Sequence, residues 1–145
     1  MTAAHATSFA PGARDWTRLR QRAFAAMEQA YAPYSGFRVG AALLASDGGI
    51  SIGCNVENAS YPAGMCAERA AVEAAVVNGV RAFTAIAIAT EAGSPTPPCG
   101  LCRQVLMEFA PHLEVFSVTR GGAEARWSMS ELLPTAFTPT SLGRG

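Results

Sequence analysis

The sequence predicts a three-layer α/β/α domain built on a mixed five-stranded sheet. A length of 145 residues favours a single domain. Strand–helix–strand patterns imply parallel strand pairs. The last two predicted strands are joined only by Gly121-Gly122 and must therefore be antiparallel, because a parallel pair needs a long crossover. We expect the domain to span residues 14–137, between a disordered N-terminal tail (1–13) and a C-terminal tail (138–145).

The first half of the chain predicts one helix followed by a hairpin. Asp15 can cap a helix whose apolar residues recur at helical spacing, and Pro33 should end it. Two strands are expected over residues 37–45 and 50–56, joined by a turn at Asp47-Gly48-Gly49.

The second half predicts two helices that each open on a cysteine. A loop over residues 57–65 leads into a helix that starts at Cys66 and stops at Asn78-Gly79. An apolar, β-branched run at 83–90 is a buried strand, and a third helix starts at Cys99. The remaining elements are strands at 113–119 and 125–129 and a short helical turn at 130–133.

Composition favours a small neutral ligand. Eleven basic and eleven acidic residues give zero net charge without a basic run, whereas a polynucleotide would require clustered cations. No apolar run approaches the roughly 18 residues of a membrane span, and residues 1–13 lack a secretory signal pattern. We therefore expect a cytoplasmic protein without membrane contact. Because half of the residues are hydrophobic, we also expect apolar surface to be buried between subunits.

The cysteines predict a metal site. Cys99 and Cys102 have the C-x-x-C spacing that lets two sulfurs reach one tetrahedral zinc, and Cys66 can be the third ligand. Glu68 follows Cys66 by two residues, so its carboxylate lies near the metal without having to bind it. Three protein ligands leave one coordination position open, which is typical of catalytic zinc.

Spacing alone leaves other interpretations of these cysteines open. Cys99 and Cys102 could be a redox pair. A closed structural site would need a fourth protein ligand, for which Cys54 and His112 are the available side chains.

The charge of the proposed centre requires a nearby cation. Thiolates bind zinc, and the positive end of a helix start favours the thiolate form of Cys66 and Cys99. Three thiolates around a divalent ion leave a net negative charge, which weakens its Lewis acidity. Arg69 is the first candidate to offset this charge through a sulfur, and Arg103 is the second.

The motifs resemble those of small zinc-dependent cytidine deaminases of pyrimidine salvage. Cys-x-Glu followed by Pro-Cys-x-x-Cys is the signature of zinc deaminases. The similarity runs from about Trp16 to Phe137 and includes the stretches Tyr34-Ser35-Gly36-Phe37, Gly53-Cys54-Asn55-Val56-Glu57-Asn58 and Glu131-Leu132-Leu133-Pro134. It implies hydrolysis of cytidine and 2′-deoxycytidine to uridine and 2′-deoxyuridine with release of ammonia. Glu68 would transfer protons to ring N3 and to the leaving amine.

The resemblance also assigns substrate contacts. Phe37 would flank the pyrimidine, Asn55 and Glu57 would bind the 3′-hydroxyl, and the backbone N–H of Ala67 would bind the pyrimidine carbonyl. Tyr61 belongs to a loop that contributes to the pocket. Phe137 matches a residue that reaches a neighbouring subunit's site, which implies a homotetramer.

Simpler roles exist for several of these side chains. Phe37 and Phe137 could be ordinary core residues, and Asn55 and Glu57 could satisfy only the backbone of a turn. The sequence departs from the family pattern at Pro97, where serine is frequent, and at Leu101, where alanine is common.

Three other functions remain open at this point. One is deamination of a modified cytosine nucleoside such as blasticidin S. The second is a zinc-stabilised binding module without catalysis. The third is editing of polynucleotides, against which the zero net charge and the Gly-Gly hairpin argue.

Overall fold

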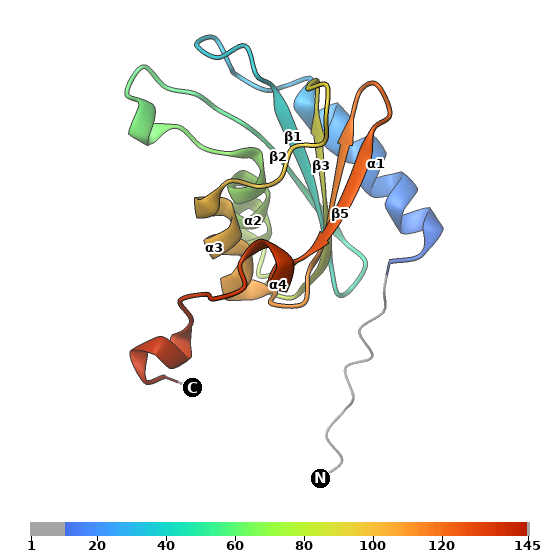
Figure 1. The fold of residues 1–145 in the computed structure, drawn as a ribbon. Helices are drawn as coiled ribbons and strands as arrows, with labels where there is room; N and C mark the ends of the chain where they lie inside the picture. Colours follow the sequence, from blue (N-terminus) through green and yellow to red (C-terminus); the bar gives the residue numbers. More distant parts are fainter. Residues whose placement is uncertain (1–10, 145) are drawn as a thin grey trace.

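The computed structural model describes residues 11–144 and shows a sheet of five strands covered by helices on both faces (Figure 1). The strands are β1 (Val39–Ala45), β2 (Ile50–Cys54), β3 (Phe83–Thr90), β4 (Glu114–Thr119) and β5 (Glu124–Ser128). The α-helices are α1 (Ala13–Met27), α2 (Ala67–Val77), α3 (Gly100–Phe109) and α4 (Met129–Leu132). Helix α1 covers one face of the sheet, and α2 and α3 cover the other. The predicted α/β/α class is confirmed.

The strand order is β2-β1-β3-β4-β5, with β3 and β4 parallel and β4 and β5 antiparallel, as the sequence predicts. The expected parallel pairing across α2 is wrong. Strand β1 lies between β2 and β3 and is antiparallel to both, so β2 and β3 share a direction without pairing. A helix about 10 Å wide covers two strand spacings of about 4.8 Å, so the crossover through α2 reaches past the neighbouring strand.

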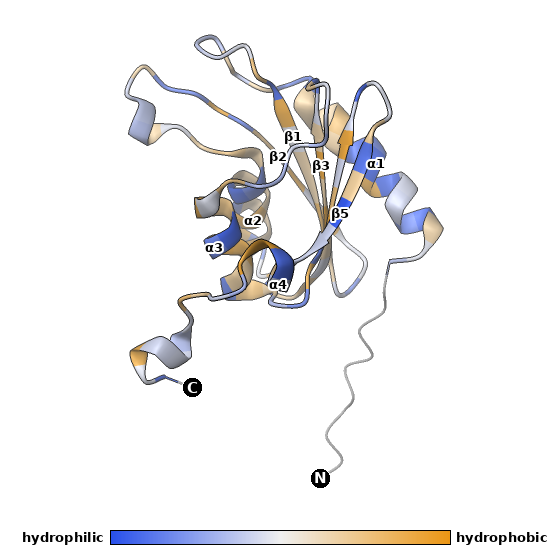
Figure 2. Cartoon of the chain, viewed as in Figure 1, coloured by the Kyte–Doolittle hydropathy of each residue, from blue (hydrophilic) through white to orange (hydrophobic). Residues whose placement is uncertain are grey.

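Apolar side chains fill a separate layer on each face of the sheet. On one face, Leu19 and Met27 of α1 pack with Phe116 of β4. On the other face, Ile88 of β3 and Leu106 of α3 are buried with a row of small residues from α2. In Figure 2 the central strands β1 and β3 are coloured as hydrophobic, whereas α1 alternates between hydrophobic and hydrophilic residues. This alternation is expected of a helix with one face on the sheet.

Two glycines allow helix backbones to lie directly on the sheet. A Cβ atom at Gly40 would stand 2.0 Å from the carbonyl oxygen of Ala23 in α1. On the opposite face, a Cβ atom at Gly53 would stand 2.4 Å from the carbonyl oxygen of Ala67 in α2. Both distances are far below van der Waals contact, so only glycine fits at these positions.

Helix α1 starts and ends earlier than predicted. It begins at Ala13 with Gly12 as its N-cap, and Asp15 is inside the first turn, where its Oδ2 accepts a hydrogen bond from the Gly12 N–H at 3.2 Å. It ends at Met27, well before Pro33. The reason is tertiary, because Tyr31 leaves the helix direction to form a β-bridge with Val56. The predicted extension of β2 to Val56 is replaced by this bridge.

The two predicted tails are described only in part. Residues 1–10 of the predicted N-terminal tail and Gly145 lie outside the described residues. Within the predicted C-terminal tail, Pro139–Leu142 forms a 3-10 turn that ends at Gly143, whose φ is +70°. A second 3-10 turn, Tyr61–Ala63, lies in the loop before α2.

Candidate active site

The starts of α2 and α3 bring three sulfurs together. Cys66 is the N-cap of α2, Cys99 is the N-cap of α3, and Cys102 lies in the first turn of α3. The Sγ atoms of Cys66 and Cys99 are 3.8 Å apart, and those of Cys99 and Cys102 are 3.5 Å apart. All three sulfurs lie within 4.8 Å of one another.

This sulfur cluster has the dimensions of a zinc site. Four ligands at about 2.3 Å from a tetrahedral ion stand about 3.8 Å apart, close to the observed separations. Thiolate ligands also favour zinc over harder cations such as magnesium. Among the described residues, neither Cys54, which is half-buried, nor the exposed His112 belongs to the cluster. The donor set therefore fits a zinc ion with three protein ligands.

The electrostatics of the cluster favour a bound cation. Hydrogen bonding with Cys102 and with the guanidinium of Arg69, whose Nη2 lies 3.6 Å from the Cys66 sulfur, together lowers the pKa of the Cys66 thiol to about 5. The pKa of Cys102 is raised because it hydrogen-bonds to Cys66 and is buried. The cluster therefore stabilises one thiolate, at Cys66, whereas ionising a second thiol beside it costs free energy. A divalent cation would remove that cost.

Glu68 and two arginines surround the cluster. Glu68 is 5% exposed, and burial raises the pKa of its carboxyl group. Arg69 contacts a sulfur directly, as expected, and hydrogen bonding to Cys66 raises its pKa. Arg103 instead donates from Nε to the Pro98 carbonyl at 2.7 Å and from Nη1 to the Leu132 carbonyl at 2.8 Å. Arg103 therefore supports Cys99 through the preceding backbone and bonds to carbonyls where a sulfur was expected.

A cavity of about 590 Å³ opens beside the sulfur cluster. This volume suits a small molecule, since such pockets measure roughly 300–1,000 Å³. The cavity is lined by Glu68, by two of the cysteines and by five of the residues that were expected to contact substrate, namely Phe37, Asn55, Glu57, Tyr61 and Ala67. Cys102 is fully buried and does not line it.

Asn55 and Glu57 line the cavity and also brace its wall. Asn55 accepts a hydrogen bond from the Val39 N–H at 2.8 Å and donates to the Phe37 carbonyl at 2.7 Å. The Glu57 carboxylate accepts hydrogen bonds from the backbone N–H and the hydroxyl group of Ser35, which lower its pKa. Both side chains therefore hydrogen-bond to nearby backbone groups, as the turn interpretation expected. These hydrogen bonds hold Asn55 and Glu57 in fixed orientations at the cavity surface.

The aromatic candidates are more exposed than core residues. Phe37 is 40% exposed at the cavity, and Tyr61 is 75% exposed, with its ring 6.0 Å from that of Tyr34 in an edge-to-face arrangement. Phe137 is 58% exposed and lies outside the cavity, and its carbonyl accepts a hydrogen bond from Gln104 at 2.8 Å. The alternative core role of Phe137 is therefore not observed.

Several lining residues carried no role in the sequence analysis. They are Tyr34, Ser35, Val39, Val56, Asn58, Gly64, Met65, Ile88, Thr96 and Pro97. The Tyr-Ser pair precedes Phe37, and Pro97 was noted only as a departure from the family pattern. Ile88 gives no sequence signal at all, because it lies in an apolar strand where every residue is expected to be core.

Removing one sulfur should remove the metal. We expect Cys102→Ala to lower zinc content from about one ion per chain to nearly none after dialysis, because two thiolates do not close the site. Metal analysis measures this directly. Cys54→Ala is the matched control, since Cys54 lies outside the cluster, and it should keep its zinc. A folded Cys102→Ala protein with full zinc content would contradict the assignment.

Comparisons with known proteins agree with this geometry. The family model described as the cytidine and deoxycytidylate deaminase zinc-binding region matches residues 14–118. A cytidine deaminase of Sporosarcina psychrophila is 48% identical over 118 residues, which are 81% of this chain and 87% of that protein. A cytidine deaminase of Mycobacterium tuberculosis is 42% identical over 137 residues, 90% of this chain and 95% of that protein.

Solved structures show the same similarity. The crystal structure of a cytidine deaminase from Burkholderia pseudomallei has a TM-score of 0.81 and 49% identity, covering 83% of this chain and 98% of that one. The crystal structure of a cytidine deaminase from Mycobacterium tuberculosis has a TM-score of 0.73 and 43% identity, covering 85% of this chain and 97% of that one.

Proposed function

Because this chain belongs to the family of cytidine and deoxycytidylate deaminases with a zinc-binding region, we propose that it hydrolyses cytidine and 2′-deoxycytidine. The products are uridine or 2′-deoxyuridine and ammonia. The observation that carries the proposal is the buried carboxyl of Glu68, which faces the cavity beside three clustered sulfurs. We assign the metal to Cys66, Cys99 and Cys102, and the proton transfers to Glu68.

The residues of this chain divide the work of the reaction. When bound, zinc supplies the Lewis acidity that makes a water molecule nucleophilic near neutral pH. Glu68 accepts the proton that this water loses as it attacks C4 and delivers it to ring N3. Glu68 then takes the second proton of that water from the new C4 hydroxyl group and passes it to the amine. The C4–N bond breaks to release ammonia as the C4 carbonyl forms. The raised pKa of its buried carboxyl suits a group that both takes and gives a proton.

Other residues orient the substrate. The first N–H groups of a helix have no intrahelical acceptor, so the Ala67 N–H at the start of α2 can donate to the pyrimidine carbonyl. Phe37 lies at the cavity, where its ring can pack against the base. Asn55 and Glu57 provide an amide and a carboxylate for the 3′-hydroxyl. These contacts leave the 2′ position unread, which is consistent with both sugars being substrates.

The charges of the cavity favour nucleosides over nucleotides. Among the described residues that line it, Arg69 is the one cation, and its guanidinium is engaged with a cysteine sulfur. Two carboxylates, Glu57 and Glu68, also line the cavity. A 5′-phosphate would therefore be buried near negative charge without a partner, which is unfavourable.

We further propose a homotetramer in the cytoplasm that serves pyrimidine salvage. Phe137 and Tyr61, which lines the cavity, are both exposed. They support assembly, because large exposed apolar groups mark interaction surfaces. In such an assembly Phe137 would complete the site of a neighbouring subunit. Across residues 11–144, none of the helices has the length and apolar character needed to cross a membrane.

The function is tested by following the ultraviolet change from cytosine to uracil with zinc-loaded protein. We expect turnover of cytidine and deoxycytidine, and a kcat/KM at least about 100-fold lower for deoxycytidylate, because the phosphate is unpaired. Turnover restricted to deoxycytidylate would overturn the nucleoside assignment. Zinc binding without turnover of either nucleoside would direct attention to modified cytosine nucleosides.

A further inference from the structure

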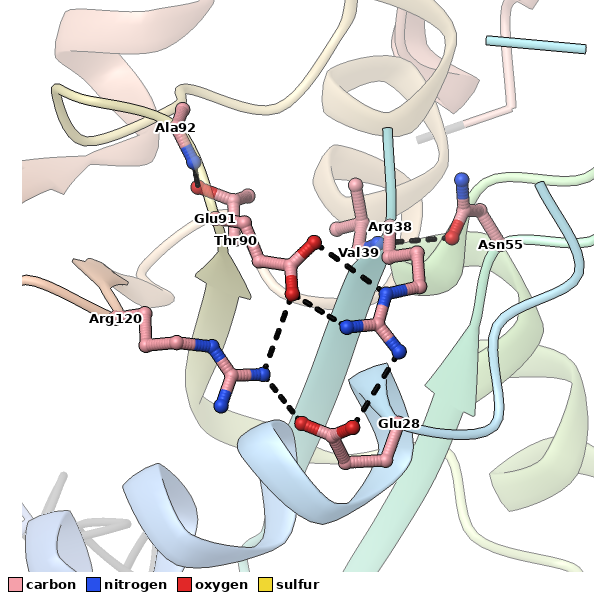
Figure 3. Close-up of polar contacts among 8 residues, drawn as sticks. All are labelled: Glu28, Arg38, Val39, Asn55, Thr90, Glu91, Ala92 and Arg120. Atoms are coloured by element: carbon pink, nitrogen blue, oxygen red, sulfur yellow. Dashed lines mark hydrogen bonds and ion pairs between the residues drawn. The ribbon is translucent and has the colours of Figure 1, made fainter. Parts of the chain in front are cut away.

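Four charged residues form an ion network at one end of the sheet (Figure 3). The ion network consists of Glu28, Arg38, Glu91 and Arg120. Arg38 donates through Nη1 to Glu28 at 3.3 Å and through Nε and Nη2 to the two carboxylate oxygens of Glu91, the Nε contact measuring 3.3 Å. Arg120 Nη2 contacts both carboxylates, at 3.4 Å in the case of Glu91. The network is electrically neutral and links every member to both residues of opposite charge.

The ion network joins four segments that are distant in sequence. Glu28 caps the end of α1, and Arg38 immediately precedes β1. Glu91 follows β3, and Arg120 follows β4. None of the four residues lines the cavity. Hydrogen bonding from Arg38 lowers the pKa of Glu91, and hydrogen bonding from Arg120 lowers that of Glu28, so both carboxylates stay charged at neutral pH.

Arg38 belongs to one wall of the cavity. Its chain neighbours Phe37 and Val39 both line the cavity, and both hydrogen-bond through their backbones to the side chain of Asn55. The side chain of Arg38 extends away from the cavity to the ion network. The Arg38 side chain therefore links this wall to the ion network.

Glu91 belongs to a second wall of the cavity, which starts from the strand next to β1. It begins the loop that leads to Cys99, and Thr96 and Pro97 of this loop line the cavity. The loop is tied back to Thr90, whose Oγ1 accepts a hydrogen bond from the Ala92 N–H at 3.3 Å and lies 3.4 Å from the Oγ1 of Thr96. The Thr90 carbonyl also accepts a hydrogen bond from the Arg120 N–H at 3.0 Å. This bond holds the backbone of Arg120 beside the start of the Glu91 loop.

We propose that the ion network is a clamp that sets the separation of these two walls and thereby the affinity of the cavity for cytidine, with Arg38 as the positioning residue. The inference rests on the proposed function, because it takes cytidine as the ligand. The clamp acts on binding and not on proton transfer, since Glu68 and the sulfur cluster are held by α2 and α3, which contribute no residue to the network.

The expected effect is moderate. The four side chains of the ion network are between 33% and 53% exposed, and a single exposed ion pair contributes little to stability. Arg38, however, bonds to two carboxylates through three nitrogens, and the planar fork of arginine fits such an arrangement. We expect Arg38→Gln to weaken cytidine binding by about three- to tenfold.

The test separates binding from turnover. In the zinc-loaded Glu68→Gln protein, calorimetry gives the equilibrium Kd for cytidine without reaction, and Arg38→Gln is added to that background. In the active enzyme, the same substitution should raise KM about three- to tenfold and leave kcat within about twofold. Arg20→Gln is the matched control, because it breaks a similarly exposed ion pair with Glu124 (2.7 Å) that joins α1 to β5.

Two further readouts distinguish a clamp from a general loss of packing. Cytidine is uncharged, so salt should not change its attraction to the protein, but salt does weaken the ion pairs of the network. A KM that rises with salt in the native enzyme, and does not rise in Arg38→Gln, therefore supports the clamp. Glu91→Gln should have a similar effect, and the double substitution should be little worse than either single one.

Unchanged Kd and KM in Arg38→Gln, or equal effects in Arg20→Gln, would overturn the clamp. A loss of kcat or zinc with unchanged KM would also overturn it, because the ion network would then act on the metal ligands. Absence of cytidine binding by the Glu68→Gln reference itself would overturn the proposed function, which the native enzyme's turnover tests separately.

Discussion

Glu68→Gln is expected to lower kcat for cytidine by about 100- to 10,000-fold while zinc and nucleoside stay bound. The amide has nearly the same shape as the carboxyl group but cannot take a proton from water or pass one to N3. Glu68 is almost fully buried, so no nearby solvent replaces it efficiently. Steady-state kinetics, metal analysis and calorimetry with cytidine measure the three quantities.

The matched control for this substitution lies on the same helix. Glu73 is an exposed residue of α2, outside the cavity, so Glu73→Gln changes the net charge of the helix equally without touching the site. Its kcat should remain that of the native enzyme. Full activity in Glu68→Gln, or an equal loss in Glu73→Gln, would show that proton transfer is not the role of Glu68.

Gly53→Ala is expected to have the second largest effect, although Gly53 lies outside the cavity. An added Cβ would stand 2.4 Å from the Ala67 carbonyl oxygen and 2.5 Å from the Ala71 backbone nitrogen. Because both atoms belong to the backbone of α2, no side-chain rotation relieves the clash and the start of the helix must move. That start carries Cys66 and Glu68, so one methyl group displaces a metal ligand and the proton-transfer group together.

The expected loss in kcat/KM is about 100-fold, since a displacement of about 1 Å costs an active site this much. Overpacking should also destabilise the fold by about 1–3 kcal/mol. Kinetics, zinc content and thermal unfolding test these expectations. Gly93→Ala is the control, because its Cβ would meet nothing within 4 Å. Native kcat/KM and zinc content in Gly53→Ala would mean that α2 tolerates the shift or does not set the geometry.

The elements that the sequence predicted well are those specified by short stretches of chain. Strand β3 was predicted with its observed bounds, because an apolar run of eight residues with β-branched side chains between loop residues is typical of a buried strand. The starts of α2 and α3 were predicted to within one residue, since Cys66 and Cys99 are the N-caps of helices that begin at Ala67 and Gly100. The C-x-x-C spacing places two sulfurs on one helix turn, so part of the metal cluster is local in origin.

The sequence alone determined the fold class through its order of strand and helix patterns, and it determined the local placement of Cys99 with Cys102 and of Cys66 with Glu68 through spacings of two or three residues. Only the tertiary structure decided that β1 lies between β2 and β3 and that Arg103 bonds to carbonyls. It also decided that α1 ends before Tyr31, which forms a β-bridge with Val56. It also decided the ion network, whose members lie on four separate segments. Such contacts depend on which faces of distant segments are buried together, and no local pattern along the chain records that choice.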